Sequence, residues 1–333
     1  EQSLWRMTVS GGRASRVERL PLMGEWASFP AISPDGRHLA YSRVRWQDDI
    51  MHIELSGPGN VAGSPTRLVS STRSDIWPEY SPNGERIAFL SNRSGTFEVW
   101  TCDSDGSSLL RAAVYTGTFG TKLSWSPEGD RIAFPLNQEG NWGILVVQAQ
   151  GGTPRRLATG LTPLSGPSEP AIDWSRDGEW IYFSSGSGNE SGIWKISAAG
   201  GKPARFTEEA GGALFKSSPE EALYYLKPKP GAYFQHSLWK LQLKDGKQSR
   251  ILDSVVRGNY AVADTGIYFI PGRDLNCLCY HLQFLDFATG QVTTVIDVED
   301  IGEGISVSPD GRSLLYTERS QTNSDVMLVE NFR

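Results

Sequence analysis

The chain has 333 residues, of which 38% are hydrophobic and 21% charged, and its formal net charge is −6 with acids and bases interspersed. Binding to the nucleic-acid backbone requires a basic stripe, and the sequence has none, so we expect no direct nucleic-acid binding by this chain. No apolar run approaches the roughly 18 residues that a membrane-spanning helix needs, and we expect no membrane insertion by this chain.

The composition and the first residue of the sequence lead to two further expectations. The sequence contains 36 Gly, 19 Pro, 11 Trp, 11 Tyr and 13 Phe, a balance that favours short strands joined by tight turns. It begins with Glu1, and no signal-peptide pattern precedes the first predicted strand. The sequence is therefore expected to be a portion of a longer protein.

A turn-and-strand signature recurs along the chain, in which Ser-Pro-Asp-Gly or a variant precedes an apolar run such as Ile-Ala-Phe. The copies begin at residues 33, 81, 126, 175, 218, 263 and 308. The resulting period of about 45 residues is typical of one four-stranded blade of a β-propeller. The copies at 218 and 263 are degraded, because Glu221 replaces the glycine of one and the other reads Ala-Asp-Thr-Gly.

Each copy predicts four antiparallel strands. Asp-Gly or Asn-Gly provides the positive-φ residues of a tight turn after the first strand. The second strand is continuously apolar and so requires cover on both faces, which neighbouring blades provide. The third strand alternates, as in Phe97-Glu-Val-Trp100, and is expected near the solvated rim. A second glycine turn and a short edge strand complete the repeat.

The sequence thus predicts an all-β fold, a seven-bladed β-propeller of four-stranded antiparallel blades that forms one domain over residues 1–333. The blade repeats are predicted to begin near residues 21, 72, 116, 166, 210, 257 and 301. Residues 1–20 are expected to help close the last blade, so that N- and C-terminal strands close the ring and remove its open edges. By spacing, Trp5 and Met327 compete for the third strand of that blade.

The repeats resemble TolB-like propeller repeats of the WD40-like (PD40) family. The second copy carries the resemblance best, with Tyr80-Ser-Pro-Asn-Gly84, Ile87-Ala-Phe89, Ser91-Asn-Arg-Ser-Gly95, Glu98-Val-Trp100 and Asp103-Ser-Asp-Gly106. The ending, Ser306-Val-Ser-Pro-Asp-Gly311 through Met327-Leu-Val-Glu-Asn-Phe-Arg333, is similar to the C-termini of bacterial, often acidobacterial, winged-helix transcriptional regulators with a propeller. That resemblance implies a periplasmic or extracytoplasmic sensor module of a larger regulator.

The sequence offers no catalytic signature. Neither a Gly-x-Ser-x-Gly nucleophile motif nor a His-Glu-x-x-His zinc motif occurs. The four histidines, His38, His52, His236 and His281, fall on predicted second or third strands and not on the strands that line a propeller channel. We therefore predict no catalytic residues, no metal site and no cofactor.

The three cysteines are interpreted as small buried hydrophobic residues. Cys277 and Cys279 are two residues apart, so on a strand they share a face without forming an easy disulfide, and Cys102 lies far away in sequence. A redox or metal role is the alternative.

Ligands of propellers usually meet the loop that enters the innermost strand of each blade. The candidate ligand-binding residues at this channel mouth are Trp26, Asp75, Trp77, Phe119, Lys122, Glu169, Lys216, Tyr260 and Glu303, with Glu25 and Asp173 beside them. Aromatic rings mixed with charges suit a polar small molecule, a sugar or a peptide. The alternative is that the rings plug the spaces between blades while the charges solvate the channel.

Three functions are compatible with this pattern. The leading hypothesis is a non-catalytic binding or sensing module, monomeric, that recognises a protein, a peptide or a small polar ligand at its top face or channel mouth. A second is a hydrolase or lyase that acts on a saccharide or peptide in the channel with paired carboxylates such as Glu169 and Glu303. A third is an architectural module that positions a neighbouring domain, since the fold does not fix the function.

Overall fold

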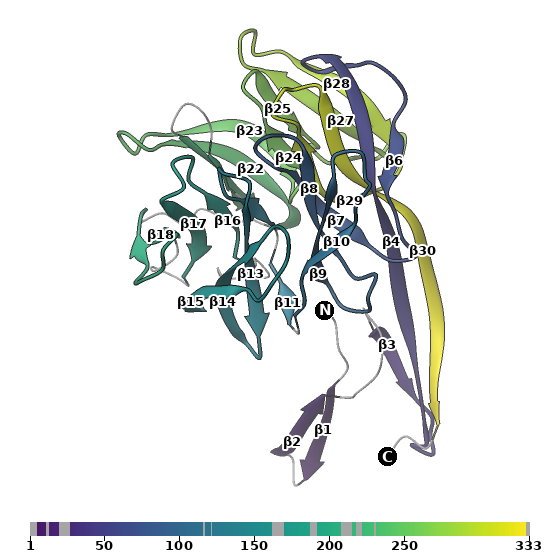
Figure 1. The fold of residues 1–333 in the computed structure, drawn as a ribbon. Helices are drawn as coiled ribbons and strands as arrows, with labels where there is room; N and C mark the ends of the chain where they lie inside the picture. Colours follow the sequence, from purple (N-terminus) through teal and green to yellow (C-terminus); the bar gives the residue numbers. More distant parts are fainter. Residues whose placement is uncertain are drawn as a thin grey trace. The chain divides into compact units, whose positions relative to one another are not determined.

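The computed structural model describes residues 5–10, 13–19, 27–115, 117–120, 122–161, 170–186, 192–207, 215–217, 222–229 and 231–330 (Figure 1). Two compact units divide the chain, one of residues 48–318 and one of residues 1–47 with 319–333. The described residues form strands and turns and contain no helix, which confirms the all-β prediction. In particular, the described part of the chain has no helix long and apolar enough to span a bilayer.

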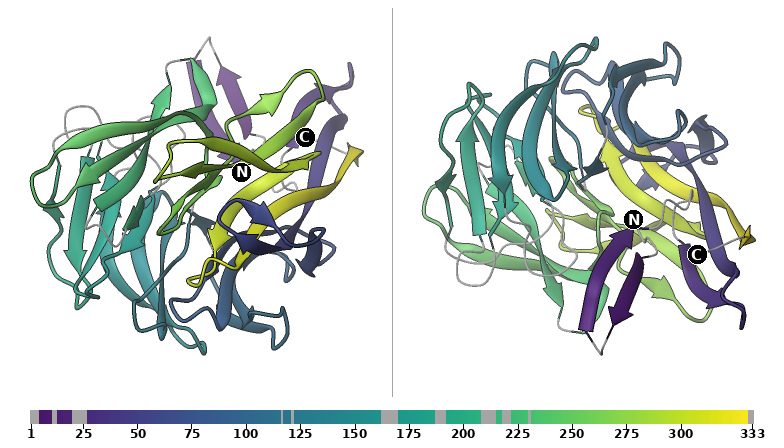
Figure 2. Two further views of the ribbon diagram at one scale, coloured as in Figure 1. Left: turned by 90° about the horizontal axis from the view of Figure 1, so that it is seen from above. Right: turned by 90° about the horizontal axis from the view of Figure 1, so that it is seen from below.

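The larger unit contains five complete antiparallel sheets and part of a sixth, and Figure 2 shows them around a common centre. Sheets 1 to 5 follow one another along the chain. Sheet 1 has β7 (Asp75–Tyr80), β8 (Arg86–Ser91), β9 (Glu98–Asp103) and β10 (Leu110–Ala113). Sheet 2 has β11 (Thr118–Phe119), β12 (Ser124–Trp125), β13 (Arg131–Gln138), β14 (Asn141–Gln148) and β15 (Arg155–Leu161). Sheet 3 has β16 (Ile172–Trp174), β17 (Trp180–Ser185), β18 (Gly192–Ser197) and β19 (Ala204–Arg205). Sheet 4 has β20 (Phe215–Ser217), β21 (Ala222–Lys229), β22 (Ala232–Gln242) and β23 (Gln248–Val256); sheet 5 has β24 (Tyr260–Val262), β25 (Gly266–Phe269), β26 (Arg273–Asp274), β27 (Cys279–Asp286) and β28 (Val292–Val298).

Sheet 6 combines strands from near both ends of the chain. Its strands are β29 (Ile301–Val307), β30 (Ser313–Glu330), β4 (His38–Gly57), β5 (Asn60–Val61), β6 (Thr66–Val69) and β3 (Ala27–Ile32). The first and seventh copies of the repeat therefore lie in this one sheet. The described strands thus give six large sheets where the repeat count predicts seven. β4 pairs with β30, and β6 pairs with β4, at the place where the sequence predicts residues 1–20.

The smaller unit contains β1 (Trp5–Ser10) and β2 (Arg13–Arg19), which pair with each other, all of β3, and the parts of β4 and β30 that lie within residues 38–47 and 319–330. Within it, Arg43 Nη2 lies 3.2 Å from Asp325 Oδ2, which joins the outer halves of β4 and β30. The guanidinium of Arg319 stacks 4.9 Å from the ring centre of Trp46.

The Ser-Pro-Asp-Gly signature forms the predicted turn between the first and second strand of a sheet. In the last copy the backbone N–H of Ser313 donates to Ser308 Oγ at 2.9 Å, and that hydroxyl donates to Asp310 Oδ1 at 2.6 Å. Gly311 closes the turn at φ 69°, a conformation that a glycine adopts without steric cost. The copies beginning at Ser81 and Ser175 repeat both serine contacts, whereas the hydroxyl of Ser126 accepts the same backbone N–H but donates to Asp130, four residues on.

The second strand of each turn supplies the core. Ile87, Ala88 and Phe89 are fully buried in β8, and Ile132, Ala133 and Phe134 are fully buried in β13, which confirms that both faces of these strands are covered. Inner strands contact one another in succession, since β7 packs on β12, β12 on β16 and β16 on β20, while β29 packs on both β7 and β24.

The cysteine prediction is wrong for two of the three residues. Cys277 and Cys279 form a disulfide with their Cα atoms 5.1 Å apart. Cys277 lies in the turn before β27 and not on a strand, and Leu278 takes φ 57°, so the two side chains converge. Cys102 is free and fully buried in β9, as predicted.

Candidate functional site

A cavity of about 840 Å³ lies within the larger unit, where the inner strands end and the Ser-Pro-Asp-Gly turns begin. Its wall is formed by the ends of β7, β12, β16, β24 and β29 and by the turns that follow them. A volume of this size falls in the range of small-molecule sites. This cavity is therefore large enough to hold a small ligand or a peptide side chain.

Four buried polar side chains occupy the same position on successive inner strands, two residues before the first residue of the turn signature. We call Glu79, Ser124, Asp173 and Ser306 the inner polar cluster. Their exposed fractions are 6%, 3%, 3% and 4%. Polar groups at such depth need hydrogen-bond partners, because an unsatisfied buried group costs about 1–3 kcal/mol.

Members of the cluster connect neighbouring sheets. Ser124 Oγ donates to Asp173 Oδ1 at 3.1 Å and accepts the backbone N–H of Trp174 at 2.9 Å, so sheet 2 is bonded to sheet 3. Ser306 Oγ accepts the backbone N–H of Tyr80 at 3.1 Å, which bonds sheet 6 to sheet 1. The cluster therefore orients the strands as well as lining the cavity.

A second, small cavity of about 30 Å³ adjoins Glu79. Lys122 Nζ lies 3.5 Å from Glu79 Oε2, and the lysine side chain is 14% exposed. The hydroxyl of Tyr260 donates to the backbone carbonyl of Tyr224 at 3.0 Å. Burial raises the pKa of Tyr260 well above its usual value of 10.0, and the charges of Asp173 and Glu79 act in the same direction. The phenol therefore stays protonated and remains a hydrogen-bond donor.

The rim of the larger cavity is formed by exposed turn residues. Pro82 and Pro309 follow the serine of their turns, and Arg312 and Asp264 add opposite charges. Four carboxylates, Glu79, Asp173, Asp264 and Asp310, and two guanidinium groups, Arg176 and Arg312, line the cavity. Hydrogen bonds from Ser308 and from the backbone N–H of Arg312 lower the pKa of Asp310, which keeps this carboxylate charged.

The structure brings three of the residues predicted from sequence together at the small cavity, namely Trp77, Lys122 and Tyr260. Trp77 has φ 56° and is 4% exposed, and a Cβ on Gly258 would lie 2.3 Å from its ring. The indole is therefore packed between strands and has no open path to a ligand from that side. Such a position is the one expected if the aromatic rings fill the space between neighbouring sheets.

Two further predicted residues serve the core. Asp75 is fully buried and pairs with Arg93, whose Nη2 lies 2.8 Å from its Oδ1. Phe119 is 7% exposed, and its ring centre lies 5.6 Å from that of Phe134. Neither residue lines the two cavities described above.

The remaining predicted residues are not brought into a common site by the described coordinates. The backbone carbonyl of Glu303 accepts a hydrogen bond from Thr317 at 2.9 Å. Lys216 lies on β20, where the structure describes the backbone only. Trp26, Glu169 and the adjacent Glu25 lie outside the described residues. The separation of the paired carboxylates Glu169 and Glu303 is therefore not defined.

Sequence reasoning missed Glu79, Ser124 and Ser306 because it placed the ligand where chains enter the inner strands, while the larger cavity lies where those strands end. A signal was present in the register, since each of these residues precedes a turn serine by two positions. Within the described parts of the chain, the one group of three potential metal ligands is Cys277, Cys279 and His281, and it lies outside the cavity.

The chain resembles known proteins more extensively in fold than in sequence. No family model matches the sequence. An uncharacterised protein of Agrobacterium fabrum is 34% identical over 103 residues, which are 31% of this chain and 32% of that protein. The match thus spans about a third of that relative's length.

Among solved structures, the chain is similar to a TolB-like protein of Agrobacterium tumefaciens, with a TM-score of 0.62, 18% identity, and coverage of 83% of this chain and 99% of the other. TolB from Acinetobacter baumannii gives a TM-score of 0.56 and 14% identity over 84% of this chain and 66% of the other. A nidogen–laminin complex gives 0.53 and 10% over 82% and 99%. These likenesses establish a TolB-like β-propeller fold.

Proposed function

We propose that this propeller is a non-catalytic binding or sensing module, and that it recognises a peptide segment or a small polar ligand where the inner strands end. The observation that supports the proposal is the cavity of about 840 Å³, whose floor is the inner polar cluster and whose rim is formed by exposed turns. Turns on a rigid sheet scaffold are common ligand contacts, because they vary without loss of the fold.

The charges favour a ligand with a cationic group. Four carboxylates and two guanidinium groups line the cavity. Two of the carboxylates, Glu79 and Asp173, are at least nine-tenths buried, so a cation that reaches them would interact in a low dielectric. Lys122 already lies 3.5 Å from Glu79 Oε2, so the ligand cation would share Glu79 with this lysine. Ser124 holds Asp173 in place through one oxygen. A protein partner would insert a lysine or arginine side chain here.

The proposal includes a cellular context. The resemblance of the C-terminal sequence to winged-helix regulators supports a role as the sensor portion of a larger bacterial regulator in the periplasm or another extracytoplasmic space. The disulfide between Cys277 and Cys279 agrees with this location, because disulfides persist in oxidising compartments. We further propose that the module is monomeric and that residues 1–333 belong to one propeller, which the seven repeat copies support.

A selection of cation-containing peptides tests the binding function. Peptides displayed on phage are selected against the immobilised protein, and their affinities are measured by calorimetry for the wild type, Glu79→Gln and Asp173→Asn. Both changes keep the side-chain shape and one acceptor oxygen. We expect each to weaken binding at least about 10-fold, which corresponds to about 1.4 kcal/mol.

The matched control is Asp105→Asn in the exposed turn after β9, which removes a carboxylate outside the cavity. This variant should bind within about 2-fold of the wild type. Equal affinities for all four proteins would contradict the proposed site. Mass spectrometry of the mixtures reveals any peptide cleavage, and turnover that depends on the cavity carboxylates would replace the binding function with a hydrolase.

A further inference from the structure

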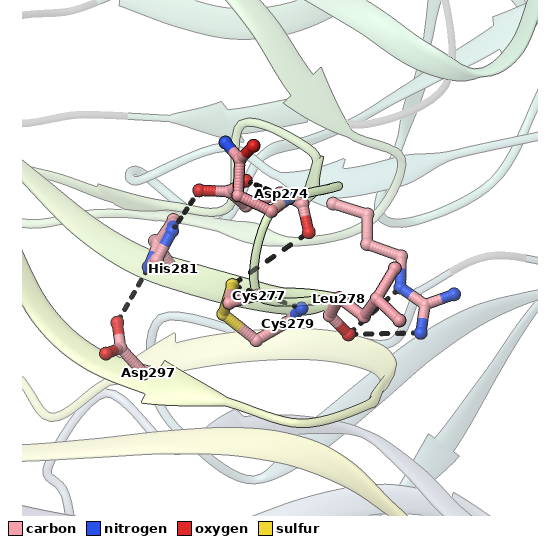
Figure 3. The surroundings of a disulfide bond; sticks show 8 residues. Asp274, Cys277, Leu278, Cys279, His281 and Asp297 are labelled. Carbon is pink, nitrogen blue, oxygen red and sulfur yellow. Dashed lines mark hydrogen bonds and ion pairs between the residues drawn. A yellow bond between two sulfur atoms is a disulfide. The ribbon is translucent and has the colours of Figure 1, made fainter.

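An exposed hairpin of sheet 5 carries a group of sulfur and nitrogen atoms that the proposed binding function does not use. The turn between β26 and β27 contains Cys277, and β27 begins with Cys279 and continues to His281 (Figure 3). Cys277 is exposed and the other two are half-buried. The two Sγ atoms and a ring nitrogen of His281 lie within 4.8 Å of one another. A metal ion could therefore contact all three with little movement of the chain.

His281 is held from both sides. Its Nδ1 lies 2.7 Å from Asp297 Oδ1 on β28, and its Nε2 lies 3.1 Å from Asp274 Oδ2 on β26. Histidines that bind metals almost always use the second ring nitrogen to donate to a carboxylate or carbonyl. Either aspartate can serve as that partner once the other yields its nitrogen to a metal.

The turn that presents the cysteines is built by its own neighbours. Both Nε and Nη2 of Arg273 donate to the carbonyl of Leu278, at 3.2 and 3.0 Å. The backbone N–H of Cys279 donates to Cys277 Sγ at 3.3 Å. The two contacts of Arg273 do not require the disulfide, because they join a guanidinium to a backbone carbonyl, and a thiol or thiolate of Cys277 can also accept the Cys279 N–H. The turn should therefore keep its shape when the sulfurs are reduced.

We propose that Cys277, Cys279 and His281 form a redox-gated binding site for a thiophilic divalent metal ion such as Zn²⁺. In the oxidised protein both sulfurs are bonded to each other, and the site is closed. Reduction by a dithiol breaks this S–S bond, with two electrons and two protons passing to the protein while the reductant becomes a disulfide. Metal binding then releases the two thiol protons and one ring proton of His281, which leaves two thiolates and a neutral imidazole as ligands.

The ligand set selects the class of metal. Two thiolates and an imidazole are typical of tetrahedral zinc sites, and a carboxylate or water can complete the coordination. Asp274 and Asp297 both lie beside the imidazole, so one can become the fourth ligand while the other orients His281. Hard cations such as Mg²⁺ and Ca²⁺ prefer all-oxygen sites and are not expected here. The hairpin thus responds to both redox state and metal supply.

Cobalt titration of the intact chain tests this proposal. The protein is treated with a phosphine reductant, the reductant is removed under argon, and Co²⁺ is added while the absorption spectrum is recorded. We expect an intense sulfur-to-cobalt band in the near ultraviolet and d–d bands typical of tetrahedral cobalt, at one ion per chain, which Zn²⁺ displaces. The oxidised protein should show neither set of bands.

Variants separate this site from adventitious binding. Cys277→Ser with Cys279→Ser should abolish the near-ultraviolet band, and His281→Gln should weaken cobalt affinity at least about 10-fold. Asp297→Asn should weaken it by a similar factor, because it removes the carboxylate that contacts His281 Nδ1. Cys102→Ala is the matched control, because that thiol is fully buried in another sheet, and it should behave as the wild type. Circular dichroism confirms that each variant is folded.

Three results would overturn the proposal. One is a reduced wild type, with two free thiols confirmed by alkylation, that gives no sulfur-to-cobalt band. The other is a band that His281→Gln leaves unchanged in intensity and affinity. A disulfide that resists the phosphine in the folded protein would equally exclude the gating step and leave a purely structural crosslink.

Discussion

The ion pair of Asp75 and Arg93 allows the sharpest quantitative prediction. Asp75 is fully buried at the start of β7, and Arg93 Nη2 contacts its Oδ1 at 2.8 Å. Within the described structure Asp75 Oδ2 has no hydrogen-bond partner, so the guanidinium supplies the compensating charge. Arg93 also donates from Nε to Ser91 Oγ at 3.0 Å and stacks 4.9 Å from the ring centre of Trp100.

Arg93→Met keeps most of the side-chain volume and removes the charge. The carboxylate of Asp75 then remains buried without a partner, which costs about 3–5 kcal/mol, a large part of the roughly 5–15 kcal/mol that stabilises a typical protein. The double variant Asp75→Asn, Arg93→Met removes both charges. We expect it to be at least about 1 kcal/mol more stable than Arg93→Met alone.

Urea denaturation followed by tryptophan fluorescence measures both effects, and Arg131→Met is the matched control. Arg131 also stacks on an indole, 5.0 Å from the ring centre of Trp174, but its acidic partners Asp130 and Glu128 are more than half exposed. Exposed pairs contribute about 0–1 kcal/mol, so the control should lose little stability. Equal losses for the two arginine variants would refute the reasoning.

Three further changes probe the turns and the inner strands. Ser308→Ala should cost about 1 kcal/mol in urea denaturation. The Ser308 hydroxyl lowers the pKa of Asp310, so the wild type should have the larger free energy of unfolding at pH values above the usual carboxyl pKa of 3.8. This difference should disappear as the pH falls through the lower pKa of Asp310 in the folded protein. Carboxyl-carbon NMR can follow that titration. Gly258→Ala should cost at least about 2 kcal/mol, since φ is +83° and the new Cβ would lie 2.3 Å from Trp77; a normal melting temperature would show that the indole moves freely. Tyr260→Phe removes a hydroxyl that donates to a buried carbonyl and should cost about 1–3 kcal/mol, whereas an unchanged denaturation curve would contradict that hydrogen bond.

Local chemistry made the sheets predictable from sequence. A serine, an acidic or amide residue and a glycine at fixed spacing specify one turn, and the structure forms it at Ser81, Ser126, Ser175 and Ser308. The apolar triplets after these turns are buried on both faces because neighbouring sheets cover them. Such signals lie within about ten residues of each other, so a single sequence contains them completely.

Pairing between distant strands was less predictable. The spacing of the repeats counts copies, but it does not specify which strands near the two ends share a sheet. In the structure β4 and β6 extend the pair of β29 and β30, so the first and seventh copies share sheet 6. Similarly, the two-residue spacing of Cys277 and Cys279 suggested a strand, and only the left-handed Leu278 shows why their sulfurs meet.

Under the proposed function, the inner polar cluster would link ligand binding to the stability of the fold. Asp173 receives the Ser124 hydroxyl and Ser306 receives the Tyr80 amide, so each bond that shapes the cavity also joins two sheets. A substitution that removes such a side chain would therefore weaken binding and folding together. Isosteric changes such as Asp173→Asn remove the charge yet keep an acceptor for Ser124, and for this reason they can separate the role of charge in ligand recognition from the role of the hydrogen bond in the scaffold.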